Sequence, residues 1–178
     1  LLSITGTPET PSKVGISIAD IAAGMYTYTN ILAALLQRQK TGKGSVIDIS
    51  MLEALGEWMG YPMYYSMDGA APPPRTGASH ATIFPYGPYL AGDGKTIMLG
   101  LQNEREWALF CEKVLLQPEL ATDVRFDKNF KRNENRVELN AIILKIFSAM
   151  TSEQVLAKLE QAQIANASLN DMHQFWSH

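Results

Sequence analysis

Apolar residues recur at helical spacing between about residues 18 and 39, and this pattern predicts one long helix. The periodic positions are Ile21, Met25, Ile31, Leu32, Leu35 and Leu36. Gly42 and Gly44 would end the helix, because glycine readily adopts the left-handed conformation found after helix C-termini. Residues 14–37 approach the length of a membrane span, but their polar and small side chains favour a buried helix of a water-soluble fold.

Two short runs flank this helix and predict strands, at residues 13–17 (KVGIS) and 45–49 (SVIDI). Ser50 then predicts the N-cap of a second helix from Met51 to about Met67, with Glu53 placed to complete a capping box. The strand, helix, strand, helix order indicates parallel α/β packing. These residues would form only part of a Rossmann-like sheet, so its remaining strands would have to lie outside this chain.

The pattern changes after a proline- and glycine-rich segment at residues 68–80 (DGAAPPPRTGASH), which predicts a linker. The runs at 83–90 and 95–101 flank the sequence AGDG and predict a β-hairpin. Helices are expected at about 104–116, 134–150 and 152–163, with N-caps at Asn103 and Thr151. Residues 133–140 are expected to form a solvated helix face, and the aromatic residues expected to pack are Tyr61, Tyr64, Tyr65 and Trp107.

The predicted fold class is therefore α/β, in four parts. Residues 1–67 would form part of a large α/β domain, and residues 68–80 a linker and loop. Residues 81–170 would form a smaller α+β domain, and residues 171–178 the start of a return linker. The absence of an initiator methionine and the ending NDMHQFWSH suggest an excerpt of a longer protein, and its exposed surface is expected to carry apolar side chains where missing strands would pack.

Charge and cysteine content exclude several classes of protein. The net charge of −3 gives no basic footprint for nucleic acid. A single cysteine, Cys111, excludes an internal disulfide framework and suits a reducing compartment. The opening LLSITG shows no secretory signal, and the histidines have no metal-binding spacing. We therefore expect a cytoplasmic protein that binds no metal, nucleic acid or membrane.

Asp20 is the only formally charged residue between Val14 and Gln37. It would lie at the junction of an apolar strand and an apolar helix. One interpretation is an N-cap, since aspartate is favoured there. The other is a working carboxylate, because the helix N-terminus favours a negative charge and α/β sheets bind ligands at this edge. Such a group could act as a nucleophile or a general base.

A second candidate site is the sequence RTGASH at residues 75–80. Gly77, Ala78 and Ser79 are small enough to form a loop that closes over a ligand. His80 could act as an acid, a base or a hydrogen-bond donor. The competing interpretation is a flexible linker with a surface histidine.

Three separated stretches resemble the family III CoA-transferases, also called the CaiB/BaiF family. The first is PSKVGISIADIAAGMYTYTNILAALLQRQKTGKGSVIDISMLEAL, and the matching frame after Asp20 consists of Arg38, Thr41, Gly42, Gly44, Val46, Asp48 and Ser50. The second, PYGPYLAGDGKTIMLGLQNEREWALFCE, resembles the opening of that family's small domain. The third, QIANASLNDMHQFWSH, resembles the segment in which the chain leaves that domain.

The resemblance implies that Asp20 is a catalytic carboxylate that exchanges coenzyme A through an aspartyl-CoA intermediate. Coenzyme A would be a substrate, with no permanently bound cofactor, and the partners would be an acyl-CoA and a small carboxylic acid. Gly77–Ser79 would match the family's glycine-rich loop, which shields the intermediate from water, although Gly-Ala-Ser replaces a run of glycines. His80 would contact the acyl group. The full-length protein would be an interlocked homodimer, with most CoA-binding residues upstream of this chain.

Two alternatives remain open from the sequence. The same family contains acyl-CoA racemases, which use the same aspartate as half of an acid/base pair with a histidine from an upstream segment. The chain could also be a non-catalytic module in which Asp20 only caps a helix. The sequence PYGPY and the helix carrying Trp107, Phe110 and Cys111 favour the transferase branch.

Overall fold

The computed structural model describes residues 1–177 and contains two compact units that divide at the Gly77–Ala78 bond. His178, the last residue of the predicted return linker, lies outside the described residues. Within the described chain, none of the helices combines the length and apolarity needed to cross a bilayer. The assignment of the two units to a large and a small domain stays a prediction.

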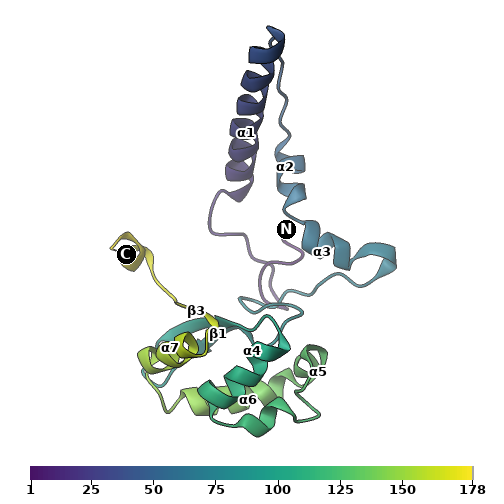
Figure 1. Cartoon of the computed structure of the whole chain (residues 1–178). Coiled ribbons are helices and arrows are strands. Elements are labelled where there is room, and N and C mark those ends of the chain that lie inside the picture. The colour runs from purple at the N-terminus through teal and green to yellow at the C-terminus, as the bar shows by residue number, and fades with distance from the viewer. Residues whose placement is uncertain (178) are drawn as a thin grey trace. The chain divides into compact units, whose positions relative to one another are not determined.

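The first unit is dominated by one long helix, α1 (Ile18–Thr41). It is followed by α2 (Met51–Glu57), α3 (Gly60–Tyr65) and the short 3₁₀ helix η1 (Met67–Gly69). Gly42 ends α1 in the left-handed conformation (φ 70°), and its N–H donates to the carbonyl of Arg38, as the sequence predicts. The chain then runs back beside α1, and α2 packs against it (Figure 1).

The prediction of two strands in this unit is wrong. Residues 13–17 and 45–49 have no strand assignment, and Val46 is fully exposed. A strand requires a neighbour for its backbone N–H and C=O groups, and the described residues provide none to either segment. The only β pairing described in residues 1–77 is an isolated bridge between Gly6 and Pro11, so these residues form no parallel α/β sheet.

The second predicted helix begins correctly but does not reach Met67 unbroken. The side chain of Ser50 caps α2 by accepting a hydrogen bond from the backbone N–H of Glu53 at 3.3 Å. The helix ends at Glu57 and restarts at Gly60. Pro62 lies in the first turn of α3, where its missing N–H is tolerated, but it could not lie inside a continuous helix without losing a hydrogen bond.

Large apolar side chains of the first unit remain exposed, as expected from the sequence. Ala22 is the only fully buried residue of α1, although the helix has 24 residues. The exposed apolar side chains of α1 are Ile21, Met25, Tyr28, Ile31, Leu32, Leu35 and Leu36. Tyr61, Tyr64 and Tyr65 are also exposed, although the rings of Tyr61 and Tyr65 pack edge to face with centroids 4.9 Å apart. The apolar pattern correctly predicted the helix, but the predicted burial of that helix is not found in this unit.

The second unit combines a three-stranded antiparallel sheet with helices (Figure 1). Strands β1 (Tyr86–Leu90) and β2 (Thr96–Gly100) form the predicted hairpin, and β3 (Ala165–Ser168), which the sequence pattern did not predict, pairs with β2. The helical elements are α4 (Glu104–Leu109), η2 (Phe110–Leu115), η3 (Pro118–Ala121), α5 (Asn129–Glu134), α6 (Arg136–Phe147), α7 (Ser152–Gln161) and α8 (Met172–Trp176). Helix α8 lies within the predicted return linker.

A single hydrophobic core holds the second unit together. It includes Tyr89, Ile97, Leu99, Trp107, Phe110, Cys111, Leu139, Ile143, Phe147, Val155 and Leu159. Trp107 is 1% exposed, as predicted, and the Cys111 thiol is buried, which raises its pKa to about 12. The predicted caps are confirmed, since Asn103 accepts from the N–H of Glu106 and Thr151 forms a capping box with Gln154.

Candidate functional site

Asp20 lies in the first turn of α1, and its side chain is exposed. The N-cap is Ser17, because its carbonyl accepts the first intrahelical hydrogen bond, from the N–H of Ile21 at 3.0 Å. The prediction that Asp20 caps the helix is therefore wrong: Asp20 is the third helical residue. The Ser17 side chain makes no capping hydrogen bond.

This position is well suited to a reactive carboxylate. The unpaired N–H groups at the start of a helix create a partial positive charge, which favours a negative side chain in the first turn. Asp20 is the only acidic residue in the first turn of α1. A carboxylate attacks as a nucleophile only when it is deprotonated and reachable. Asp20 is exposed and is therefore reachable.

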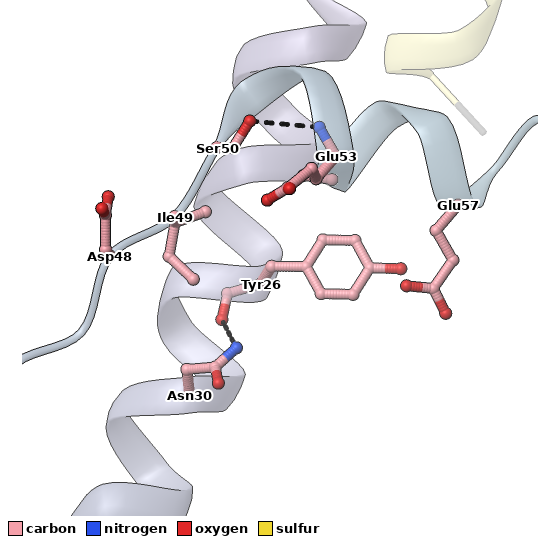
Figure 2. A pocket seen from close by; sticks show the side chains of 8 residues that line it. Tyr26, Asn30, Asp48, Ile49, Ser50, Glu53 and Glu57 are labelled. Carbon is pink, nitrogen blue, oxygen red and sulfur yellow. Dashed lines mark hydrogen bonds between the residues drawn. The ribbon is translucent and has the colours of Figure 1, made fainter.

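The first unit also contains a pocket of about 160 Å³ between α1 and the start of α2 (Figure 2). Its lining residues are Tyr26, Asn30, Asp48, Ile49, Ser50, Glu53, Ala54 and Glu57. The Tyr26 ring extends across the pocket toward Glu57 (Figure 2). Three carboxylates line this space, so it is a poor site for the phosphates of coenzyme A. Across residues 1–177, no three potential metal ligands lie close enough to hold an ion.

The candidate loop Gly77–His80 spans the boundary between the units, and Gly77 belongs to the first. Gly77 has φ +65°, a conformation that favours glycine, and its N–H donates to the carbonyl of Gly6 at 2.8 Å. The preceding Arg75 donates to the carbonyls of Thr7 and Pro8 at 2.9 and 2.8 Å. The end of the predicted linker is therefore tied to the start of the chain.

Ser79 and His80 lie against β1 in the second unit. The N–H of His80 donates to the carbonyl of Tyr86 at 2.9 Å. A Cβ atom on Gly87 would lie 2.7 Å from Oγ and 3.0 Å from Cα of Ser79, so the close approach requires glycine. Ala78 precedes this contact and is exposed. The flexible-linker interpretation is wrong for Ser79 and His80.

The imidazole of His80 is held in one orientation. Its Nδ1 accepts hydrogen bonds from the backbone N–H groups of Thr82 and Ile83, both at 3.1 Å. The ring stacks on Tyr86 with centroids 5.2 Å apart. Burial, and secondly the positive charge of Arg136, lower the pKa of His80 from its ordinary value. Because Nδ1 accepts, these hydrogen bonds assign the proton of the neutral ring to Nε2.

Side chains from α5 and the start of α6 hold the segment that follows His80. Asn129 accepts from the N–H of Phe84 at 3.1 Å and donates to the carbonyl of Thr82 at 2.8 Å. Asn133 donates to the same carbonyl at 2.6 Å, and Arg136 donates to the carbonyl of His80 at 3.0 Å.

The sequence interpretation missed these residues. Asn133 and Arg136 lie in the range 133–140 that was predicted to face solvent, so that prediction is wrong for them. Asn129 and Asn133 are four positions apart in α5 and so share one face of that helix, whereas Arg136 begins α6. The four-residue spacing is the signal that could have identified the two asparagines.

The whole sequence, including the exposed aspartate in the first turn of α1, also matches a known protein family. The sequence model of CoA-transferase family III matches residues 1–178, so the chain belongs to this family.

Curated relatives carry transferase names. Succinyl-CoA:glutarate CoA-transferase from Mus musculus is 36% identical over 160 residues, covering 89% of this chain and 35% of the relative. Succinyl-CoA:mesaconate CoA-transferase from Haloarcula marismortui is 33% identical, covering 90% and 40%. Acetyl-CoA:oxalate CoA-transferase from Acetobacter aceti is 31% identical, covering 97% and 44%. The chain thus spans less than half the length of each.

Solved structures share the fold. A CaiB/BaiF family protein from Brucella suis is 28% identical with a TM-score of 0.77, over 99% of this chain and 47% of that one. A hypothetical protein from Mycobacterium tuberculosis has a TM-score of 0.81 at 20% identity, over 97% and 45%. The chain therefore has the mixed helical and small-sheet architecture of CaiB/BaiF proteins.

Proposed function

We propose that this chain supplies the nucleophile and a substrate-binding loop of a CoA-transferase that moves coenzyme A from an acyl-CoA to a carboxylic acid. The observation that carries the proposal is the position of Asp20. It is an exposed carboxylate in the first turn of α1, in a chain that matches the family over residues 1–178. All three relatives named above are CoA-transferases with carboxylic acid substrates in their names, which supports this class over a racemase.

In the first half of the reaction, an oxygen of Asp20 attacks the thioester carbon of the donor. The carbon–sulfur bond breaks, CoA thiolate leaves, and a mixed anhydride of Asp20 and the acyl group forms. The thiolate then attacks the carbonyl carbon of the Asp20 side chain. The anhydride bond breaks, the donor leaves as a carboxylate, and Asp20 is left as its CoA thioester.

The second half reverses these steps with a different acid. The acceptor carboxylate attacks the thioester of Asp20, which releases CoA thiolate and forms a second anhydride. The thiolate attacks the acyl carbon, so that a new acyl-CoA leaves and the Asp20 carboxylate is regenerated. No proton and no electron is gained or lost over the cycle, so no redox cofactor is required.

The loop Gly77–His80 supplies substrate contacts in this proposal. Gly77, Ala78 and Ser79 are small enough to cover the intermediate and exclude the water that would hydrolyse it. His80, the last residue of the loop, is proposed to contact the acyl group. Ser79 and His80 lie against β1, which gives this part of the loop a defined position.

The complete protein is proposed to be a cytoplasmic, interlocked homodimer that binds neither nucleic acid nor membrane. Light scattering on the purified complete protein measures its mass, and cell fractionation locates it. A monomeric mass would contradict the assembly, and recovery in a membrane or secreted fraction would contradict the location.

Mass spectrometry of the intermediate tests the proposed reaction. The complete protein that carries this chain is incubated with succinyl-CoA, quenched in acid and digested. We expect a CoA-sized addition on the peptide that contains Asp20, absent from the Asp20→Asn variant. Exchange of the α-hydrogen of a branched acyl-CoA with deuterated water, without an adduct, would instead show a racemase. An intact protein with neither result would leave Asp20 a structural residue and refute the proposal.

A further inference from the structure

Two side chains of α5 and the first side chain of α6 bind the backbone that follows the candidate loop. Asn129 and Asn133 both donate to the carbonyl of Thr82, at 2.8 and 2.6 Å. Asn129 also accepts from the N–H of Phe84 at 3.1 Å. Their targets are backbone groups 45 to 51 residues away in sequence, so these contacts fix the path of residues 82–84 rather than the helix itself.

Arg136, at the start of α6, adds a contact to His80. Its guanidinium donates to the carbonyl of His80 at 3.0 Å and to Oδ1 of Asn133 at 2.6 Å. It also lies over the ring of Phe84, 5.0 Å from the centroid. One side chain therefore joins both ends of the segment 80–84 to Asn133.

The consequence for His80 follows from its own hydrogen bonds. Nδ1 can accept from the N–H groups of Thr82 and Ile83 only while the backbone keeps its turn after His80. That turn is held by Asn129, Asn133 and Arg136. These three residues therefore set the direction of the imidazole and which nitrogen carries its proton.

The geometry points to Asn129, Asn133 and Arg136 as positioning residues that hold the loop Ala78–His80 and the His80 ring in their substrate-binding arrangement. None of them is assigned to substrate contact, and they act through the backbone of residues 80–84. The inference rests on the proposed function for its catalytic consequence. Whether these residues hold the backbone of residues 80–84 can be measured even in a protein that transfers no CoA.

Hydrogen exchange in the complete protein tests the structural part. In Asn133→Ala and Arg136→Lys, the amides of Thr82 and Ile83 should exchange at least about tenfold faster, because the turn that positions their acceptor is loosened. Lysine keeps the charge of Arg136 but cannot donate from a planar fork to both acceptors. Glu134→Ala is the matched control, since Glu134 lies on the same helix with an exposed side chain. Amides of β2 should remain unchanged in all three variants.

Steady-state kinetics test the catalytic part. If the loop excludes water, the two variants should hydrolyse acyl-CoA severalfold more often per transfer, while Glu134→Ala keeps the wild-type ratio. A general loss of stability would lower both rates together and leave their ratio unchanged. Unchanged exchange at Thr82 and Ile83 would overturn the inference, whatever the activity. Faster exchange with an unchanged ratio would overturn the catalytic role alone. If the wild-type protein transfers no CoA, the proposed function fails, and the exchange result still decides whether these residues hold the loop.

Discussion

The carboxylate of Asp93, in the turn between β1 and β2, accepts hydrogen bonds from both the backbone N–H and the hydroxyl of Ser152, at 3.0 and 2.7 Å. Ser152 is the first residue of α7. The turn therefore satisfies a donor at the start of a helix 59 residues further along the chain. These hydrogen bonds lower the pKa of the Asp93 carboxyl from its ordinary value.

Asp93→Asn should reduce stability at neutral pH, because an amide oxygen is a weaker acceptor than a carboxylate. The folded-state pKa of Asp93 lies below its unfolded value of 3.8, so this stabilisation is present above pH 3.8 and is lost as the pH falls through the folded pKa. Denaturation midpoints at pH 7 and pH 3 measure the effect. The difference from wild type should shrink at pH 3, and Glu9→Gln, which changes an exposed carboxylate outside the helices, should show none. An equal difference at both pH values would contradict the assignment.

Arg132→Met should destabilise the second unit strongly. Arg132 is 2% exposed, lies 4.9 Å from the centroid of Trp107, and donates to the carbonyls of Phe84 and Phe126 and to Glu104. Methionine fills similar volume but leaves two buried carbonyls without their donor, at a cost of about 3 kcal/mol. Urea denaturation measures this cost. The exposed Arg105→Met is the control, and a loss of less than about 0.5 kcal/mol in Arg132→Met would contradict the structural role.

Asp20→Asn should abolish transfer without harming the fold. Asparagine has nearly the same shape but cannot form the anhydride, so we expect a drop in kcat of at least about a thousandfold. Because Asp20 is exposed and Asn removes only its interaction with the helix N-terminus, the free energy of unfolding should change by less than about 1 kcal/mol. Activity and urea denaturation are measured on the same complete protein. Glu57→Gln, which changes a pocket carboxylate in the same unit, should retain activity. Undiminished transfer by Asp20→Asn would exclude it as the nucleophile.

Protonation of His80 should weaken the second unit. Its folded-state pKa lies below the ordinary value of 6.5, so the neutral ring contributes stability above pH 6.5 that is lost as the pH falls through the folded pKa. A proton on Nδ1 would face the N–H groups of Thr82 and Ile83, and the cation would lie near Arg136. The ring resonances of selectively labelled histidine report this titration. A midpoint above 6.5 would contradict the hydrogen-bond assignment.

Local signals predicted helices at α4, α6 and α7 and two of their caps, but they missed α5 and α8. Asn103 with Glu106 and Thr151 with Gln154 form the expected caps, because a cap depends on residues only three positions apart. The β1–β2 hairpin was also predictable from its turn. The third strand was missed because ANAS is short and polar, and only pairing with β2 makes it a strand.

The failures in the first unit have a related cause. The segments KVGIS and SVIDI have the composition of strands, but a strand exists only when another segment pairs with it. Asp20 was identified correctly as an isolated charge, yet its cap assignment failed because the helix begins two residues earlier, at Ile18. The roles of Asn129, Asn133 and Arg136 depend on a segment some 50 residues upstream, which local pattern cannot show.

Helix α1 extends for 24 residues, or about 36 Å, and the apolar side chains along one of its faces are exposed. In a fragment limited to residues 1–77, this apolar helix face would be exposed to water throughout purification. Such a fragment should aggregate at micromolar concentration and form inclusion bodies during overexpression. A solubility tag or mild detergent would keep it dispersed.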